Sequence, residues 1–559
     1  MFRTQYLLLT LISISCLLLL SGCSSNNTAR HMRSIEGNQP IDTESLYQDG
    51  IEGKDLSLEM YLLEKGRISQ LEGNYKESLK AFNGEIDLLK ERELNDDTLP
   101  GADINAGSVL VNDNLLPYKA RLFEIEMLRL YQAYNYLALG SMEGALVEVR
   151  ISDYLMREAE KNRNLINFQE EKFRTSETAA YKKTFENQSL IESGKLENDY
   201  LPQGFPDKSL PANDLLTRPD ETELYLATEP IDNPYNEYPA SSDSSHENQN
   251  YYFNQIEDAN NQSFEDMKDI LSKANSSILN PYILYVSGVL HEMNGENDDA
   301  YISYKQALLL MPENPYFRQD TIRLAIISDK EYDLEKLKSA YPQDYMQVVA
   351  TNALKNKGRL VVLYEEGWAP GKEQKFISLG AFAIAYPIYN FTWNEPAPLV
   401  IDSETGLLGT TSPACYMGAM ALRALQEESK WRIIRQSARA AFKAGVYGSG
   451  VTAAAVGTAS DNSYMQAAGL MTMLLSQAYN NLSENADLRS WMTLPGNAQI
   501  MSKHLPNGEY KLVFSPHNSD LQLKERVVIS ENKTTILWVV KVANRMIYKC
   551  LWPSSTVNQ

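Results

Sequence analysis

Hydrophobic positions follow two different spacings along this chain of 559 residues. From near Leu56 to about residue 350 they recur at the spacing of α-helices, apart from a polar stretch over 196–265. From about residue 357, short runs rich in β-branched and aromatic residues indicate strands. The pattern predicts an α+β multidomain protein, in which a helical part precedes an antiparallel β-rich part with a helical insertion.

The helical part contains a recurring arrangement of small and large residues, which is clearest over 281–312. Small Gly288 and Ala300 would let two antiparallel helices approach, with Gly295 in the turn between them. Tyr304 is expected to face the groove between the helices, and Pro312 to end the second helix. This is the spacing of a tetratricopeptide (TPR) repeat.

Two earlier stretches fit the same frame. The matching positions are Leu62, Gly66, Gly73, Ser78 and Phe82 in the first stretch, and Ala133, Tyr136, Gly140, Ala145 and Val149 in the second. They are offset by about 67 residues, or about two repeats of 34. A generic helical hairpin is the alternative for each stretch. We expect TPR-like repeats over 45–195 and 266–350.

The polar stretch over 196–265 is rich in proline, serine and asparagine. Such a composition buries too little apolar surface to offset the entropy lost on ordering. We expect an irregular insertion whose tyrosines dock locally on the repeats. These are Tyr235, Tyr238, Tyr251 and Tyr252.

The C-terminal part, 357–559, combines predicted strands with a helical insertion near 413–482. The strands are expected at 359–364, 375–379, 382–386, 508–514, 525–529 and 535–540, and Pro506-Asn507-Gly508 signals a tight turn. Four basic residues recur at helical spacing in the insertion, and a solvated face is favoured over a docking stripe for them. They are Arg432, Arg435, Arg439 and Lys443. The Gly/Ala-rich stretch 445–475 fits a packed hairpin better than a membrane-contacting one.

The N-terminus has the pattern of a secretory signal, with Arg3 followed by an apolar core of about 14 residues. It ends in Leu20-Ser21-Gly22-Cys23, which resembles the lipobox of bacterial lipoproteins. The resemblance implies cleavage after residue 22 and acylation of Cys23, with 23–44 as a flexible tether. Ser24 in place of aspartate favours the outer membrane, with the protein facing the periplasm.

The chain has a formal net charge of −21, which speaks against nucleic-acid binding and against adhesion to anionic lipid. After removal of the signal, Cys415 and Cys550 are the cysteines besides Cys23. A disulfide between them and two free thiols both remain open.

No zinc-protease, phosphate-loop or dinucleotide motif occurs in the sequence. Asp487, Arg489 and Trp491 are either a recognition site for a polar partner or, as we favour, an ion pair beside a core tryptophan. A carboxylate pair at Asp402 and Glu404 is a weak hydrolase signal. We expect no catalytic residue, cofactor or metal site.

Three stretches carry a family resemblance: 111–118, 135–140 leading to Val147-Glu148-Val149-Arg150, and 486–491 leading to Leu494-Pro495. The chain resembles an uncharacterised family of TPR-containing bacterial outer-membrane lipoproteins with a C-terminal β-rich domain. Members of such families are often encoded near lipoproteins that activate peptidoglycan synthases. The usual second arginine after Arg150 is Ile151 here.

These observations predict a lipid-anchored, non-enzymatic scaffold of the cell envelope, whose repeats bind a protein or peptide partner. Peptidoglycan or envelope assembly is the expected process. The alternatives are a glycan-binding or glycan-cleaving periplasmic enzyme and an accessory lipoprotein of a secretion pore.

Overall fold

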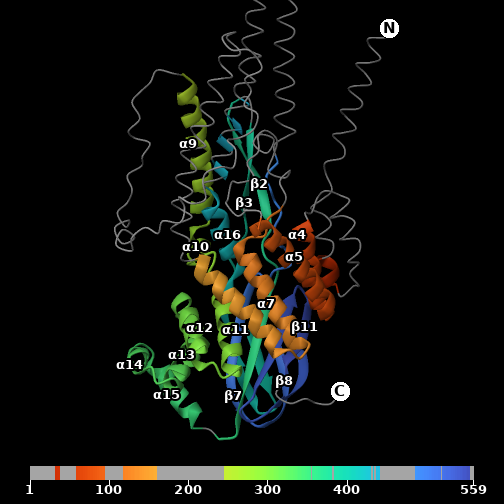
Figure 1. Ribbon diagram of the computed structural model, residues 1–559, viewed down its shortest axis with the longest axis vertical. Helices are drawn as coiled ribbons and strands as arrows, with labels where there is room; N and C mark the ends of the chain where they lie inside the picture. The colour runs from red at the N-terminus through yellow and green to blue at the C-terminus, as the bar shows by residue number, and fades with distance from the viewer. Residues whose placement is uncertain are drawn as a thin grey trace, which may run out of the picture.

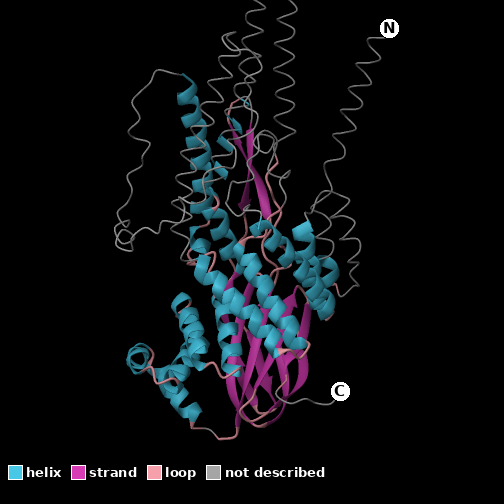
Figure 2. Ribbon diagram, viewed as in Figure 1, coloured by secondary structure: helices cyan, strands magenta, loops and turns pink. Residues whose placement is uncertain are grey.

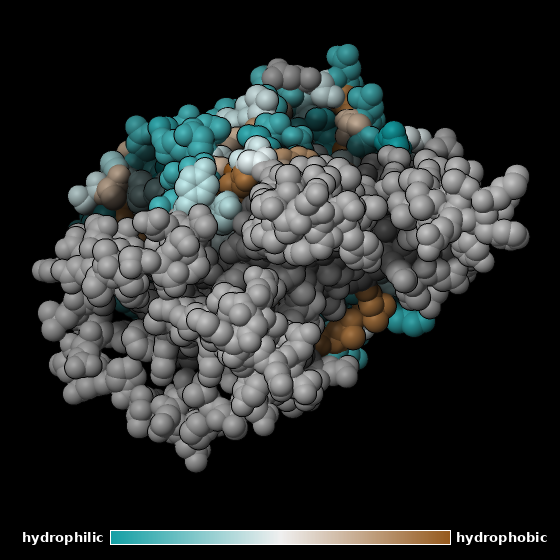
Figure 3. All heavy atoms as spheres, turned by 90° about the horizontal axis from the view of Figure 1, so that it is seen from above, coloured by the Kyte–Doolittle hydropathy of each residue, from teal (hydrophilic) through white to brown (hydrophobic). Residues whose placement is uncertain are grey.

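The computed structural model describes most of the chain outside its N-terminal 31 residues and four long internal segments. The described residues are 32–37, 58–94, 118–159, 244–353, 355–380, 383–429, 432–433, 436–437, 439–440, 443, 485–517 and 519–553. They form an α+β fold in which a five-stranded sheet lies between a layer of helices and a four-stranded sheet (Figures 1 and 2). Seen from above, the described surface is mostly hydrophilic, with small hydrophobic areas (Figure 3).

Antiparallel helical hairpins build the helical layer. Its helices are α4 (Leu58–Glu72), α5 (Tyr75–Leu94), α7 (Leu122–Ala138), a helix over 142–159, α11 (Pro281–Met293), α12 (Asn297–Leu310), α13 (Pro315–Ile327), α14 (Glu331–Ala340) and α15 (Pro342–Asn352). Asn280 and Asn314 cap α11 and α13 by accepting hydrogen bonds from backbone N–H groups of the first turn.

The turn glycines and the small interface residues explain why these hairpins form. Gly73, Gly140 and Gly295 have φ of 87°, 80° and 81°, a conformation that other residues rarely adopt. A Cβ on Gly66 would lie 2.3 Å from the ring of Phe82, and one on Gly288 would lie 2.6 Å from that of Tyr304. Each glycine therefore allows an aromatic ring of the second helix to pack on the first.

Three further predicted repeat residues lie where the frame places them. Ala145 and Ala300 are fully buried in the second helices of their hairpins. Pro312 follows α12, which ends at Leu310.

The five-stranded sheet has the order β11-β10-β1-β7-β6. Its strands are β1 (Lys357–Glu366), β6 (Ser412–Tyr416), β7 (Asn497–Pro506), β10 (Thr534–Val542) and β11 (Arg545–Trp552). The expectation of an antiparallel domain needs one correction, because β1 and β10 pair in parallel. These two strands are separated by most of the C-terminal part of the chain, which supplies the long crossover that a parallel pair requires.

The second sheet covers the face of the first that points away from the helices. Its order is β5-β4-β8-β9, formed by β4 (Leu399–Ser403), β5 (Gly406–Thr410), β8 (Gly508–Pro516) and β9 (Leu523–Ile529). Alternate residues of β1 point to the two sides, so that Leu360 and Val362 face this sheet while Val361 and Leu363 face the helices. The turn at Pro506–Gly508 is therefore not a hairpin: it leads the chain from one sheet to the other.

One hydrophobic cluster contains residues from both the helices and the five-stranded sheet, including Tyr134, Leu284, Val361 and Trp538. The two parts that the sequence predicts, repeats and a β-rich part, are therefore separate along the chain but not in space. In space the two parts share a core.

A two-stranded ribbon, β2 (Lys372–Ser378) paired with β3 (Ala383–Tyr389), extends beyond the two sheets (Figure 1). Residues 244–265, which were expected to be irregular, instead form the helix α9 (Ser244–Glu265) beside this ribbon. Ile256 is fully buried in a cluster with Leu379 and Ile384, and Tyr252 packs on it. The prediction was wrong because these apolar residues find partners on β2 and β3, rather than on the repeats.

The helical insertion begins later than predicted, because 412–416 is strand β6 and α16 spans Met417–Glu427. The basic residues beyond it do not form a solvated face. Arg432, Arg439 and Lys443 are at most 5% exposed, and Arg432 donates a hydrogen bond to Asn260 of α9. Arg435 and the stretch 445–475 lie outside the described residues.

Candidate functional site

The most strongly charged part of the described interior lies where the helices meet strand β1. One contact there, the Arg67 pair, joins Arg67 of α4 to Glu365 of β1, and both side chains are fully buried. The guanidinium also donates to Gln70 at 3.0 Å and to the backbone oxygen of Thr493 at 3.3 Å. It lies 4.0 Å from the ring centre of Tyr131, which adds a cation–π contact.

The Arg67 pair has a second carboxyl group nearby, that of Glu64 one turn earlier on α4. Its oxygens accept hydrogen bonds from the N–H of Met492 at 2.8 Å and from the hydroxyl of Thr493. Burial raises the pKa of Glu64 to about 7, although these hydrogen bonds oppose the rise. Burial also raises the pKa of Glu365, against the opposing charge of Arg67. Glu64 and Arg67 thus both contact Thr493, but the charge that acts on the pKa of Glu64 is that of Glu124, which raises it further.

A second contact, the Arg359 network, consists of Arg359 on β1, Glu292 on α11, and Asp320 and Arg323 on α13. Arg359 donates to Glu292 at 2.7 Å and to Asp320 at 2.6 Å. Arg323 donates to the same two carboxylates, at 2.7 Å to Glu292 Oε2 and at 2.9 Å to Asp320 Oδ1. Two arginines and two carboxylates therefore neutralise one another inside the protein.

Two tyrosines complete the Arg359 network. Tyr285 donates to Asp320 at 2.7 Å, and Tyr304 donates to Glu292 at 3.0 Å. Burial alone would raise the pKa of Glu292, but the charges of Arg323 and Arg359 outweigh it and lower that pKa to about 2. His504, on β7 opposite Arg359, has its pKa lowered to about 3 by burial and by the two arginines, so it is neutral. Every charge of the network thus has a partner.

These contacts show what covers the inner face of the helical hairpins. The first helices α4 and α11, together with α13, direct Arg67, Glu292 and Asp320 at strand β1, and aromatic side chains fill the space between. A peptide bound in the usual groove of a helical repeat would need this same space. In this protein the chain's own sheet occupies it.

The segment with Asp487, Arg489 and Trp491 is part of the same interface. Trp491 is 1% exposed, and its ring centre lies 5.9 Å from those of both Phe82 and Tyr131. Asp487 accepts a hydrogen bond from Arg489 at 2.8 Å. The structure thus brings these three residues together as an ion pair beside a core tryptophan, which is the interpretation that we favoured over a recognition site.

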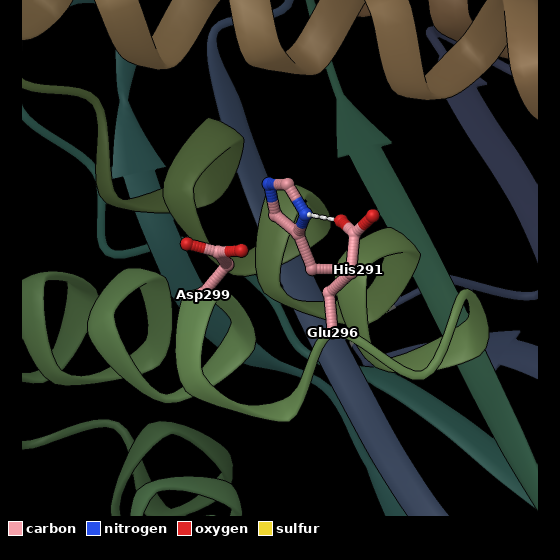
Figure 4. A group of neighbouring side chains, drawn as sticks. All are labelled: His291, Glu296 and Asp299. Atoms are coloured by element: carbon pink, nitrogen blue, oxygen red, sulfur yellow. Dashed lines mark hydrogen bonds and ion pairs between the residues drawn. The ribbon is translucent and has the colours of Figure 1, made fainter.

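A cluster around His291 is the one group of histidine, cysteine and carboxylate residues in the described part of the chain that has the spacing of a metal site. Its other members are Glu296 and Asp299, and the ligand atoms all lie within 4.8 Å of one another (Figure 4). His291 Nδ1 lies 2.6 Å from Glu296, and Nε2 lies 3.4 Å from Asp153.

Charge pairing explains the His291 cluster without an ion. Burial would lower the pKa of His291, but hydrogen bonds to Asp153 and Glu296 raise it, which favours a ring that is protonated on both nitrogens and can donate to both carboxylates. Arg150 forms an ion pair with Glu296. The cluster therefore joins the helix 142–159 to the hairpin of α11 and α12.

The two cysteines do not form a disulfide, because both are free in the structure. Cys415 is buried on β6, while Cys550 is exposed on β11. These strands are the opposite edges of the five-stranded sheet, so four strand spacings, or about 19 Å, separate them. A disulfide requires Cα atoms within about 7 Å.

The carboxylates of the weak hydrolase signal lie on the surface at the β4–β5 turn. Glu404 is 61% exposed there and pairs with Lys511. Asp402 is half-buried on β4, an inner strand of its sheet.

Comparison with protein-family models, with curated proteins and with solved structures gives no match for this chain. Among the described helices, none combines the length and the hydropathy needed to cross a bilayer. Cys23 lies outside the described residues.

Sequence reasoning did not find the Arg67 pair or the Arg359 network. A charged residue inside an apolar strand, such as Arg359 or Glu365 in 357–366, is the signal that would have indicated them.

Proposed function

We propose that this protein is a non-enzymatic scaffold of the bacterial cell envelope, anchored by acyl chains at Cys23 and built on TPR-like repeats. The observation that carries the proposal is a packing pattern common to three hairpins. A small residue of the first helix, Gly66, Ala133 or Gly288, precedes by 16 positions a large one of the second, Phe82, Val149 or Tyr304, and a glycine with positive φ follows the small residue by seven. Repeats of this kind serve mainly to present surfaces to other proteins.

The partner surface that we propose is the outer end of the helical layer, because the inner face is filled by the protein's own sheet. The helix α14 has no buried residue, and α15 buries only Val348. Two large apolar side chains are exposed there, Tyr332 by 75% and Met346 by 62%. Solenoid proteins usually end in a hairpin with a polar outer face, so an apolar end is suited to binding another protein.

We further propose that the process is envelope assembly at the periplasmic face of the outer membrane. The lipobox at Cys23, the serine after it and the resemblance to TPR-containing outer-membrane lipoproteins support this assignment. Tethering would raise the effective concentration of a partner that is itself held at a membrane.

Photo-crosslinking in cells tests the partner surface. A photoreactive residue in place of Tyr332 should yield adducts with one or a few envelope proteins. The matched control is the same residue in place of Leu407, which is also apolar and 62% exposed but lies on β5. Adducts that form equally from both positions, or only from Leu407, would contradict docking at α14 and α15.

A further inference from the structure

The short segment 32–37 lies where a flexible tether was expected, yet it packs against the folded body. Residues 32–36 form a helical turn, and Ile35 is 1% exposed within the main hydrophobic cluster. The segment is here called the membrane clip. Burial of the isoleucine side chain stabilises the contact, so this segment is held against the body and does not behave as a free linker.

Two hydrogen bonds from different parts of the body hold the clip. Arg545, at the start of β11, donates to the backbone oxygen of Ile35 at 2.8 Å. Trp368, just beyond β1, donates from its indole N–H to Glu36 at 2.8 Å. Glu36 and Gly37 also border an open groove of about 550 Å³, whose other walls are the end of α4 and the first residues of β11. The clip therefore fixes the chain to the β11 edge of the five-stranded sheet.

The distance from the clip to the proposed lipid anchor is short. Met32 follows Cys23 by nine residues, and nine residues span at most about 32 Å when fully extended. The β11 edge must then stay within about that distance of the acyl chains. The other edge of the sheet, β6, is four strands away, and α13 to α15 lie on that side of the molecule (Figure 1).

We propose that the membrane clip turns the β11 edge of the protein toward the headgroups of the bilayer and holds α14 and α15 away from them. This inference rests on the proposed anchoring at Cys23. The headgroups would be zwitterionic ones, because a chain with a net charge of −21 is repelled by anionic lipid. Without the clip, the linker from Cys23 to the body would be longer and would allow the body to rotate freely.

Energy transfer to a vesicle surface tests this orientation. The mature chain, with Cys550→Ser to remove the exposed thiol, is coupled through Cys23 to maleimide lipid in phosphatidylcholine vesicles. A donor dye is placed, as a non-natural residue, at exposed Asn544 beside β11 or at Tyr332 on α14. With acceptor dye on the headgroups, transfer from position 544 should be several-fold stronger than from position 332. Equal transfer from both positions would overturn the proposal.

Two variants separate the clip from other causes of orientation. Ile35→Asp puts a charge into the core site, so the difference between the two donor positions should vanish. Arg545→Met removes one hydrogen bond without adding a charge, and it should reduce the difference only in part. Circular dichroism checks that both variants stay folded. An unchanged difference in a folded Ile35→Asp variant would show that the clip does not set the orientation.

Failure of the clip and failure of the proposed anchoring give different results. Chemical coupling at Cys23 makes the energy-transfer result independent of acylation in the cell. Labelled palmitate in growing cells tests the anchoring by itself. Absence of label would contradict the proposed anchoring, and with it the membrane role of the clip, even if the coupled protein were oriented.

Discussion

The Arg67 pair and the Arg359 network both attach helices to strand β1, but they balance charge differently. The Arg359 network has two arginines for two carboxylates, and the pKa of Glu292 falls to about 2. At the other place the one arginine, Arg67, pairs with Glu365, whereas Glu64 is shifted by burial and by the charge of Glu124, and its pKa rises to about 7. Burial acts in the same direction at both places, so the number of neighbouring cations decides which way a carboxyl pKa moves.

The two ends of this interface should therefore respond oppositely to pH. The pKa of Glu292 lies below its usual 4.5, so its stabilisation is complete above pH 4.5 and is lost as the pH falls toward 2. The pKa of Glu64 lies above 4.5, so its contribution is complete below pH 4.5 and is lost as the pH rises through about 7. Four substitutions test this contrast.

The largest effect is expected from Arg359→Met. This change leaves Glu292 and Asp320 with only Arg323 as a cation, and removing one member of a buried ion network typically costs about 3–5 kcal/mol. The free energy of unfolding, measured with urea at pH 7, should fall by that amount. The matched control is Lys511→Met at the exposed pair with Glu404, which should cost no more than about 1 kcal/mol. A comparable loss in the control would remove the distinction between buried and exposed pairs.

The next effect is the pH dependence of Glu64→Gln. Keeping a carboxyl ionised when its folded pKa is about 7 rather than 4.5 costs about 3 kcal/mol, and glutamine avoids this cost. The variant should therefore unfold at higher urea concentration than the unaltered chain at pH 8, and at a similar concentration at pH 5. A gain in stability that is the same at both pH values would show that Glu64 is ionised throughout.

A smaller effect is expected from Gly288→Ala. The added methyl group would lie 2.6 Å from the Tyr304 ring, and overpacking of this kind costs about 1–3 kcal/mol. Tyr304 also donates to Glu292, so the change should disturb the Arg359 network as well. Calorimetry of Gly288→Ala and of Gly66→Ala compares the two ends of the interface, because the ring facing Gly66 belongs to Phe82 and carries no hydroxyl group. If Gly66→Ala lowered the melting temperature more than Gly288→Ala, the contact of Tyr304 with the Arg359 network would not add to the loss of stability.

The smallest effect is expected from Gly295→Ala. No atom lies within 4 Å of the added methyl group, so only the positive φ of 81° opposes it, at a cost of about 1 kcal/mol. The melting temperature should fall slightly, and the acid response of Glu292 should not change. A loss as large as that of Gly288→Ala would mean that backbone strain, rather than ring packing, limits these hairpins.

Local pattern was enough to predict the hairpins at Gly66–Phe82 and Gly288–Tyr304, since a small residue, a turn glycine and a facing ring occur at fixed spacing in the sequence. The strands 359–364 and 535–540 were also predicted, because continuous apolar runs indicate strands buried on both faces. Strands β4 to β7 and β11 were missed, since they are short or mix polar and apolar residues. Helix α9 was missed because its few apolar residues are buried only when β2 and β3 are beside them.

By itself the sequence determined the α+β class, the helical hairpins with their turn glycines and the positions of several strands, because each depends on residues close together in the chain. Long-range packing alone pairs β1 with β10 in parallel, places the sheet on the inner face of the helical hairpins, and brings Arg67 to Glu365 across 298 positions. Such contacts depend on how distant segments pack, and the pKa of a buried carboxyl depends on which cations that packing places beside it.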